Sequence, residues 1–160
     1  MAEGKDPIAA PVFGSSAVLV GDRIAVTYLV DVQSRLALFG LDGRSQGEIA
    51  LPAAGTVARF VGREDTPEIF YTFSSPIYPT TVFRYEAETK QSTAFEAAKP
   101  PVDVSRYETK ALFARSKDGT RVPFFLTARK GLPRNGANPT MLYGYGGFHI
   151  PTGPGFKPEW

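Results

Sequence analysis

"RIAVTYLV" at residues 23–30 is matched in pattern by "EIFYTFSS" at residues 68–75, an offset of 45 residues. Both runs are rich in β-branched and aromatic residues, and polar or turn-forming residues lie next to both of them. Such runs are typical of β-strands. The sequence therefore predicts two strands that occupy equivalent places in two copies of one structural unit.

A second pair of runs follows the first pair. "ALFGLDG" is matched 44 residues later by "TVFRYEA", which aligns Phe39 with Phe83 and Leu41 with Tyr85. Each unit then contains two strands and a further short strand. A repeat of about 40 to 50 residues with four-stranded character is the spacing of β-propeller blades. Two units do not make a propeller, and a small β-sandwich with coincidentally similar hairpins stays open as an alternative.

The rest of the chain also favours strands over helices. With 14 prolines and 16 glycines among 160 residues, it has no long run of apolar residues at helical spacing. Further strand-like runs follow the repeat: "ALFARS" before "KDG", "VPFFLTARK" and "TMLYGYG". Asp118 and Gly119 supply the positive φ that a tight hairpin needs. We therefore expect a mostly β protein.

The character of the sequence changes at "EAAKPPVDVSRYETK". Lys99, Pro100 and Pro101 interrupt any ladder of hydrogen bonds, which predicts a linker between two structural units. After the predicted hairpin, residues 131–139 read as a polar loop. Residues 140–143 then read as a central strand that runs into a glycine-rich turn. This predicts that the turn lies at the carboxyl end of a sheet, which is where α/β enzymes keep their ligands.

Composition excludes several classes of function. The 18 lysines and arginines nearly balance 16 acidic residues, giving a net charge of +2 and no basic stripe for nucleic acid. There is no cysteine for a disulfide, a thiolate metal site or a nucleophile. No apolar run is long enough to span a membrane. The sequence after Met1 shows no signal peptide, provided that Met1 is the natural start.

The sequence does not contain a recognisable set of catalytic residues. No serine lies in a Gly-x-Ser-x-Gly elbow, and the only histidine, His149, has no evident partner, so we expect it to be an ordinary loop residue. The carboxylates show no metal-ligand spacing. The glycines near residue 145 lack the ending of a phosphate-binding loop. We therefore predict no metal and no cofactor.

The most distinctive segment is "MLYGYGGFHI" at residues 141–150. Tyr143 continues the predicted strand, and we expect it to be a core residue, while Tyr145 and Phe148 surround the turn. A tyrosine hydroxyl can donate a hydrogen bond, and a phenylalanine ring can form an apolar wall. Three glycines are expected to shape the backbone and allow close approach: Gly144, Gly146 and Gly147.

Two motifs carry a family resemblance. "SKDGTRVPFFLTARKG" followed by "NPTMLYGYGGF" resembles the start of the catalytic domain of prolyl oligopeptidases, serine peptidases in which a β-propeller caps an α/β-hydrolase domain. Upstream, "VTYLVDVQSRLALFGLDG" and "IFYTFSSPIYPTTVFRYE" resemble the last propeller blades of this family. The resemblance implies C-terminal propeller blades at 1–98 and the first hydrolase strands at 99–160, with both domains incomplete.

The resemblance also implies roles for individual residues. Tyr145 would supply a hydroxyl to the oxyanion hole, and Phe148 would line the S1 pocket that takes a proline ring. The family's serine, aspartate and histidine have no counterpart in the chain, so we expect the 160 residues alone to be inactive. In the complete enzyme the substrates would be short proline-containing peptides cleaved after proline.

The remaining expectations concern the context of the protein. The complete enzyme would be a monomer without nucleic-acid or membrane partners. We expect it in the cytoplasm, with the periplasm left open because Met1 is not established as the natural start. A non-catalytic, β-rich module that binds peptides or proteins is the alternative function.

Overall fold

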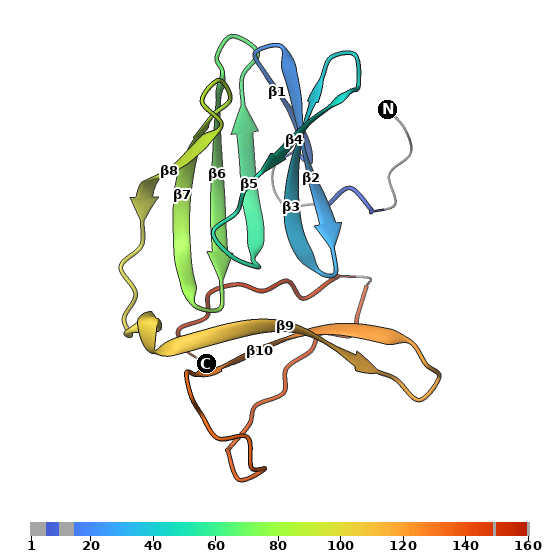
Figure 1. Ribbon diagram of the computed structural model, residues 1–160, viewed down its shortest axis with the longest axis vertical. Coiled ribbons are helices and arrows are strands. Elements are labelled where there is room, and N and C mark those ends of the chain that lie inside the picture. The colour runs from blue at the N-terminus through green and yellow to red at the C-terminus, as the bar shows by residue number, and fades with distance from the viewer. Residues whose placement is uncertain (1–5, 10–14, 149, 160) are drawn as a thin grey trace.

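The computed structural model describes residues 6–9, 15–148 and 150–159. The described chain forms two four-stranded antiparallel sheets and one two-stranded hairpin (Figure 1). The first sheet contains β1 (Ala17–Val20), β2 (Arg23–Val30), β3 (Gln33–Gly40) and β4 (Ser45–Ile49). The second contains β5 (Thr56–Gly62), β6 (Glu68–Ser75), β7 (Tyr78–Glu86) and β8 (Gln91–Ala97).

Each sheet is a meander in which every strand pairs with its neighbours in sequence. After the second sheet come the 3₁₀ turn η1 (Val104–Arg106) and the strands β9 (Tyr107–Arg115) and β10 (Arg121–Arg129). No α-helix occurs in the part of the chain that the structure describes. The mostly β prediction is confirmed.

The predicted repeat is real, with one correction. The two runs at offset 45 are β2 and β6, with the predicted bounds. The second alignment was wrong by two residues: Ile24 pairs with Phe39, whereas Ile69 pairs with Tyr85. Phe39 therefore corresponds to Tyr85 and not to Phe83. The second unit has one residue more than the first between these paired positions, and a β-bulge near the end of β6 accommodates it.

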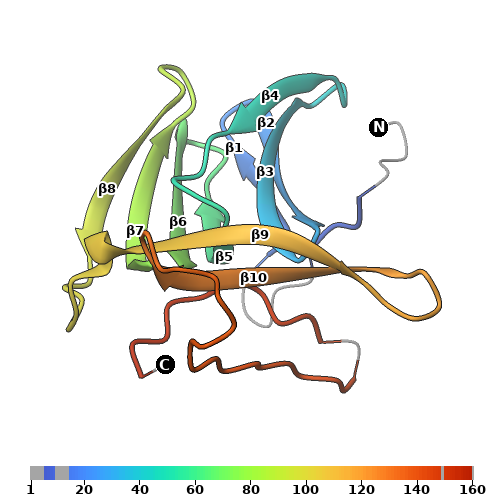
Figure 2. The same cartoon turned by 60° about the horizontal axis from the view of Figure 1, so that its bottom comes forward.

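The main hydrophobic core lies where the two sheets pack on each other (Figures 1 and 2). Alternate residues of β6 point into this junction and are fully buried, as a half-covered sheet requires. The ring of Tyr71 stacks on Phe83 at a centroid distance of 5.3 Å. Phe73 meets the edge of Tyr78 at 5.5 Å. The aromatic residues thus fill one side of the junction, and small and aliphatic residues of the first sheet, such as Ala25, fill the other.

The opposite face of the first sheet has a smaller core of Val26, Tyr28 and Ala37. Residues 7–9 lie along the same edge of β2 as β1, since the amide of Ala9 donates to the Thr27 carbonyl and the amide of Leu29 donates to the Pro7 carbonyl, both at 2.9 Å. This edge of β2 therefore has backbone partners along both of its halves.

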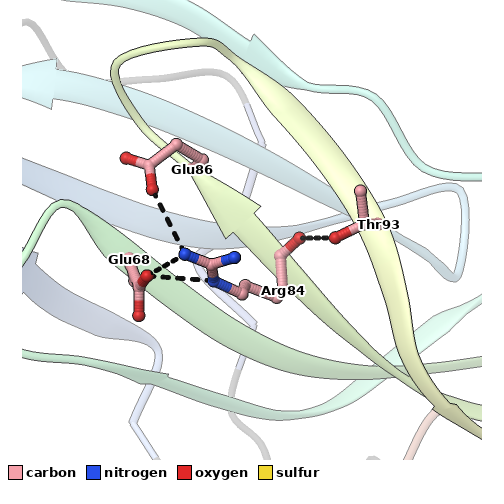
Figure 3. Close-up of polar contacts among 4 residues, drawn as sticks. All are labelled: Glu68, Arg84, Glu86 and Thr93. Atoms are coloured by element: carbon pink, nitrogen blue, oxygen red, sulfur yellow. Dashed lines mark hydrogen bonds and ion pairs between the residues drawn. The ribbon is translucent and has the colours of Figure 1, made fainter.

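The outer face of the second sheet is partly charged. Arg84 pairs with Phe70 in the second sheet, and Leu38 pairs with Ala25 at the equivalent place in the first sheet. The guanidinium of Arg84 contacts Glu68, its Nε lying 2.9 Å from Oε1, and lies 3.6 Å from Glu86 (Figure 3). The covered face of the first sheet therefore has a leucine where the exposed face of the second sheet has an arginine.

The hairpin β9–β10 lies across the ends of both sheets (Figures 1 and 2). We call these ends, which are closest to the hairpin, the lower ends. The hairpin turn forms as predicted, although of Asp118 and Gly119 only Gly119 has a positive φ, at 88°. The Asp118 carboxylate accepts a hydrogen bond from the Thr120 amide at 3.0 Å, which lowers the pKa of Asp118. Residues 99–101 carry no strand or helix.

The predicted strand at 140–143 is not formed. Residues 131–139 are an irregular polar loop, as predicted, and residues 140–147 continue without pairing to any described strand. A β-strand needs a neighbour for its backbone hydrogen bonds, and no described strand offers one here. The strand prediction is therefore wrong for the chain as described.

Candidate functional site

The glycine-rich segment exposes several large apolar side chains. Tyr143 and Tyr145 are each 49% exposed, and Phe148 is 87% exposed. Met141 and Leu142 before them are also exposed. The expectation that Tyr143 belongs to the core is therefore wrong here, because the strand that would bury it is not formed.

The three glycines do not adopt the special geometry that we expected. None of Gly144, Gly146 and Gly147 has a positive φ. A Cβ at either of the first two would meet nothing within 4 Å. The left-handed residue of the turn is instead Phe148, at φ 57°. Since nothing approaches Gly144 or Gly146 in the described chain, and the atoms nearest to Gly147 belong to Tyr145, their backbone-shaping role is not visible in it.

Local contacts hold the turn together. The Tyr145 ring folds back over Gly147, where a Cβ would lie 3.7 Å from the ring and from its hydroxyl oxygen. The amide of Ile150 donates to the Gly147 carbonyl at 3.1 Å. The ammonium group of Lys157 lies 4.8 Å from the centre of the Tyr143 ring, within cation–π range. The segment after the turn thus reaches back to the residue that begins it.

The C-terminal segment also contacts the sheets. Pro154 is buried, and its carbonyl accepts a hydrogen bond of 3.0 Å from the Thr56 hydroxyl at the start of β5. In Figure 1 this segment runs along the lower ends of the sheets. Sequence reasoning did not single out Thr56 or Pro154, and a threonine and a proline 98 positions apart give no local signal of their contact.

Other predicted features of the site can be located only in part. His149 lies outside the described residues. Among the residues that are described, no cluster of histidine and carboxylate side chains could hold a metal ion. No helix in the same part of the chain is long and apolar enough to cross a membrane.

Comparison with known proteins identifies the fold of the first part. Residues 9–98 match the model of the prolyl oligopeptidase N-terminal β-propeller domain. A prolyl endopeptidase of Elizabethkingia miricola is 34% identical over 137 residues, covering 86% of this chain and 19% of the relative. The prolyl oligopeptidase ophP of Omphalotus olearius is 33% identical over 147 residues, covering 89% of this chain and 20% of the relative.

Solved structures agree with the sequence relatives. Prolyl oligopeptidase B from Galerina marginata, bound to a 25mer macrocyclization substrate, matches 99% of this chain with a TM-score of 0.83 and 25% identity, covering 22% of its own chain. The chain spans about a fifth of the length of the curated relatives that it matches. The family match covers more than half of the chain, and it favours propeller blades over a β-sandwich. The chain therefore belongs to the prolyl oligopeptidase family.

Proposed function

We propose that this chain is part of a serine endopeptidase that hydrolyses short peptides on the carboxyl side of proline. The observation that carries the proposal is the similarity to prolyl endopeptidases, at 34% identity over 137 residues. That length exceeds the span of 9–98 matched to the propeller domain, so the similarity extends beyond the propeller match.

In this proposal, residues 1–98 are the last blades of the propeller and residues 99–160 begin the α/β-hydrolase domain. Two observations support the division. The hairpin β9–β10 is a sheet separate from the other two, and the residues joining it to β8 include Pro100 and Pro101. The exposed apolar side chains of 141–148 also fit a segment that a larger sheet would cover.

Tyr145 would act as a donor in the oxyanion hole. Attack on a peptide carbonyl places negative charge on its oxygen, and a preorganised hydroxyl in a water-poor site stabilises that charge. The phenol is half exposed, with its ring resting on Gly147, so it is accessible to an incoming carbonyl. The nucleophile, base and acid would come from residues beyond this chain.

Phe148 would form one wall of the pocket for the proline ring. Its side chain is the more exposed of the two proposed site residues, and it lies three positions after Tyr145. Proline offers a compact ring and no N–H donor, so an aromatic wall selects it by shape and apolar area. The two residues would therefore divide catalysis and specificity between them.

The test uses the 160-residue chain and the complete gene product that contains it. We expect the chain alone neither to cleave a blocked Gly-Pro fluorogenic peptide nor to react with a fluorophosphonate probe, while the complete product does both. Tyr145→Phe in the complete product should lower kcat about 10²- to 10³-fold with little change in KM. Phe148→Ala should mainly raise KM.

Two results would overturn the proposal. One is cleavage of the peptide by the 160-residue chain itself. The other is a complete product that binds proline-containing peptides without cleaving them, which would support a non-catalytic binding module instead. Full activity in Tyr145→Phe would remove only the role assigned to that residue.

A further inference from the structure

A connected set of hydrogen bonds joins the two sheets at their lower ends. The amide of Ser34, at the start of β3, donates to the Gly55 carbonyl at 2.9 Å. The hydroxyl of Ser34 accepts from the Val57 amide, also at 2.9 Å. These bonds lie on both sides of Thr56, so the backbone that carries Thr56 is held to the first sheet.

The C-terminal segment binds at this point. Besides the hydrogen bond from Thr56 to the Pro154 carbonyl, the packing of Gly153 is tight, since a Cβ there would lie 2.6 Å from the Thr56 hydroxyl oxygen. Proline has no N–H to leave unsatisfied on burial, and its fixed φ lowers the entropy lost on docking. The sequence "GPG" at 153–155 is thus suited to a close, buried contact.

The turn between β2 and β3 contacts the same segment. The Val32 carbonyl oxygen would lie 3.6 Å from a Cβ at Gly153. Asp31 and Val32 have φ values of 47° and 65°, a conformation that is unfavourable for a β-branched residue. On its other side, Asp31 lies 3.9 Å from Arg121 at the start of β10. One turn therefore meets both the hairpin and the C-terminal segment.

From Pro154 it is three residues to Lys157, whose ammonium group lies over the Tyr143 ring. The segment therefore contacts the sheet junction through Thr56 at one end and the aromatic turn through Tyr143 at the other.

We propose that residues 153–157 form a strut that positions the aromatic turn against the junction of the two sheets, with Thr56 and Pro154 as its anchor. Thr56 and Pro154 are positioning residues, since they act on the turn through the segment that their mutual hydrogen bond holds. The inference rests on the proposed function for its catalytic meaning. Its structural content concerns only where residues 143–148 are held.

The first experiment measures docking of the strut. Chymotrypsin should cut after Phe156 only when the segment leaves the sheets. At low conversion, mass spectrometry separates this cut from those at the exposed residues 142–148, and its rate follows the population of the undocked form. Thr56→Val keeps the shape of the side chain and removes the hydroxyl. We expect it to speed this cleavage about 3- to 10-fold, the usual effect of one hydrogen bond. Thr56→Ser should restore the slow rate.

The second experiment reports on the turn itself. Because the chain has no cysteine, Glu88→Cys and Leu142→Cys place two spin labels at exposed positions, one in the turn between β7 and β8 of the second sheet and one before the aromatic turn. We expect a narrow distance distribution in the parent and a clearly broader one with Thr56→Val. Thr93→Val, another threonine of the same sheet, is the matched control and should leave the distribution narrow.

Gly153→Ala disturbs the anchor from the C-terminal segment and leaves the residues of the sheets unchanged. Its Cβ forces either the segment or the Thr56 hydroxyl to move, so it should reproduce the faster cleavage and the broader distribution. The thermal unfolding midpoint of the sheets should stay unchanged. This separates positioning of the turn from a general loss of stability.

The inference is overturned if Thr56→Val and Gly153→Ala leave the cleavage rate and the distance distribution unchanged. It is equally overturned if the variants lower the unfolding midpoint while the distribution stays narrow. Neither readout needs catalysis, so failure of the strut leaves the proposed peptidase function intact. Conversely, an inactive complete product would not affect these measurements.

Discussion

The sheets and the aromatic turn use the same residue types in opposite ways. Phe73 of β6 is fully buried, whereas Phe148 is 87% exposed. Tyr71 is 1% exposed and Tyr145 is half exposed. A Cβ at Gly55 would collide with a ring, whereas one at Gly146 would meet nothing. Residue type alone therefore does not say which part of this chain is packed.

The difference comes from the neighbours that each segment has. Strands β5 to β8 pair with each other, and their inward side chains pack on the first sheet. Residues 140–147 have neither a paired strand nor a covering layer among the described residues. Burial then follows from whether a segment has partners on its edges and faces. Matched substitutions in the two regions test this directly.

The largest effect is expected for the phenylalanine pair. Phe73→Ala should lower the free energy of unfolding by about 3–5 kcal/mol, because it opens a cavity in the junction between the sheets. Phe148→Ala should change it by less than about 0.5 kcal/mol. Urea unfolding of both variants measures the difference. Equal losses would show that the turn is packed in solution and would remove the contrast.

The glycine pair should give an intermediate effect. Gly55→Ala places a Cβ 2.3 Å from the Phe73 ring and 2.6 Å from the Ser74 carbonyl oxygen, so we expect a loss of about 1–3 kcal/mol from overpacking. Gly146→Ala meets no atom within 4 Å, and it should be neutral or slightly stabilising because alanine restricts the unfolded chain. Thermal unfolding of the two variants and of the parent measures both changes in stability.

The tyrosine pair should give the smallest effect, and it depends on pH. Burial raises the pKa of the Tyr71 phenol above its usual value, and the hydrogen bond with Ser92 partly opposes the shift. The raised pKa contributes stability that is complete below the unfolded value of about 10 and is lost as the pH rises through the folded value. The second sheet should therefore weaken at alkaline pH.

Tyr71→Phe tests this point. Near pH 7 it should cost about 1 kcal/mol, since the hydrogen bond of 3.0 Å to Ser92 is lost. Between about pH 9 and 11 its stability should fall less than that of the parent, with Tyr85, whose pKa is also raised by burial, accounting for the remainder. Tyr145→Phe is the control. An unchanged alkaline slope in Tyr71→Phe would show that another group causes the loss.

The sequence predicts the strongest strands well. Residues 23–30 and 68–75 form strands with the predicted bounds because both combine β-branched and aromatic residues over a full strand length. It predicts the weaker ones poorly. β4 reads "SQGEI" and is almost entirely exposed, so its pairing with β3 rather than its own composition makes it a strand. The bulge between Phe73 and Ser75 leaves no sequence signal, and it accounts for one of the two residues by which the alignment at Phe39 was wrong.

The candidate site was predictable as a segment but not as a geometry. The aromatic and glycine residues of 143–148 mark the turn clearly, whereas a strand at 140–143 requires backbone partners that the sequence of the segment cannot reveal. The anchor between Thr56 and Pro154 was missed for a related reason. A contact between distant positions depends on how the two sheets meet, and this is a property of the folded chain.

The charged outer face of the second sheet bears on self-assembly. Stacking one sheet on the next is a head-to-tail contact, and such contacts grow into filaments unless something stops them. Where the first sheet presents Leu38 to its neighbour, the second presents Arg84 with Glu68 and Glu86. Burying this ion pair under another copy would cost desolvation energy without new partners. A neighbouring sheet would therefore fit this face only if it brought polar partners for Arg84, Glu68 and Glu86.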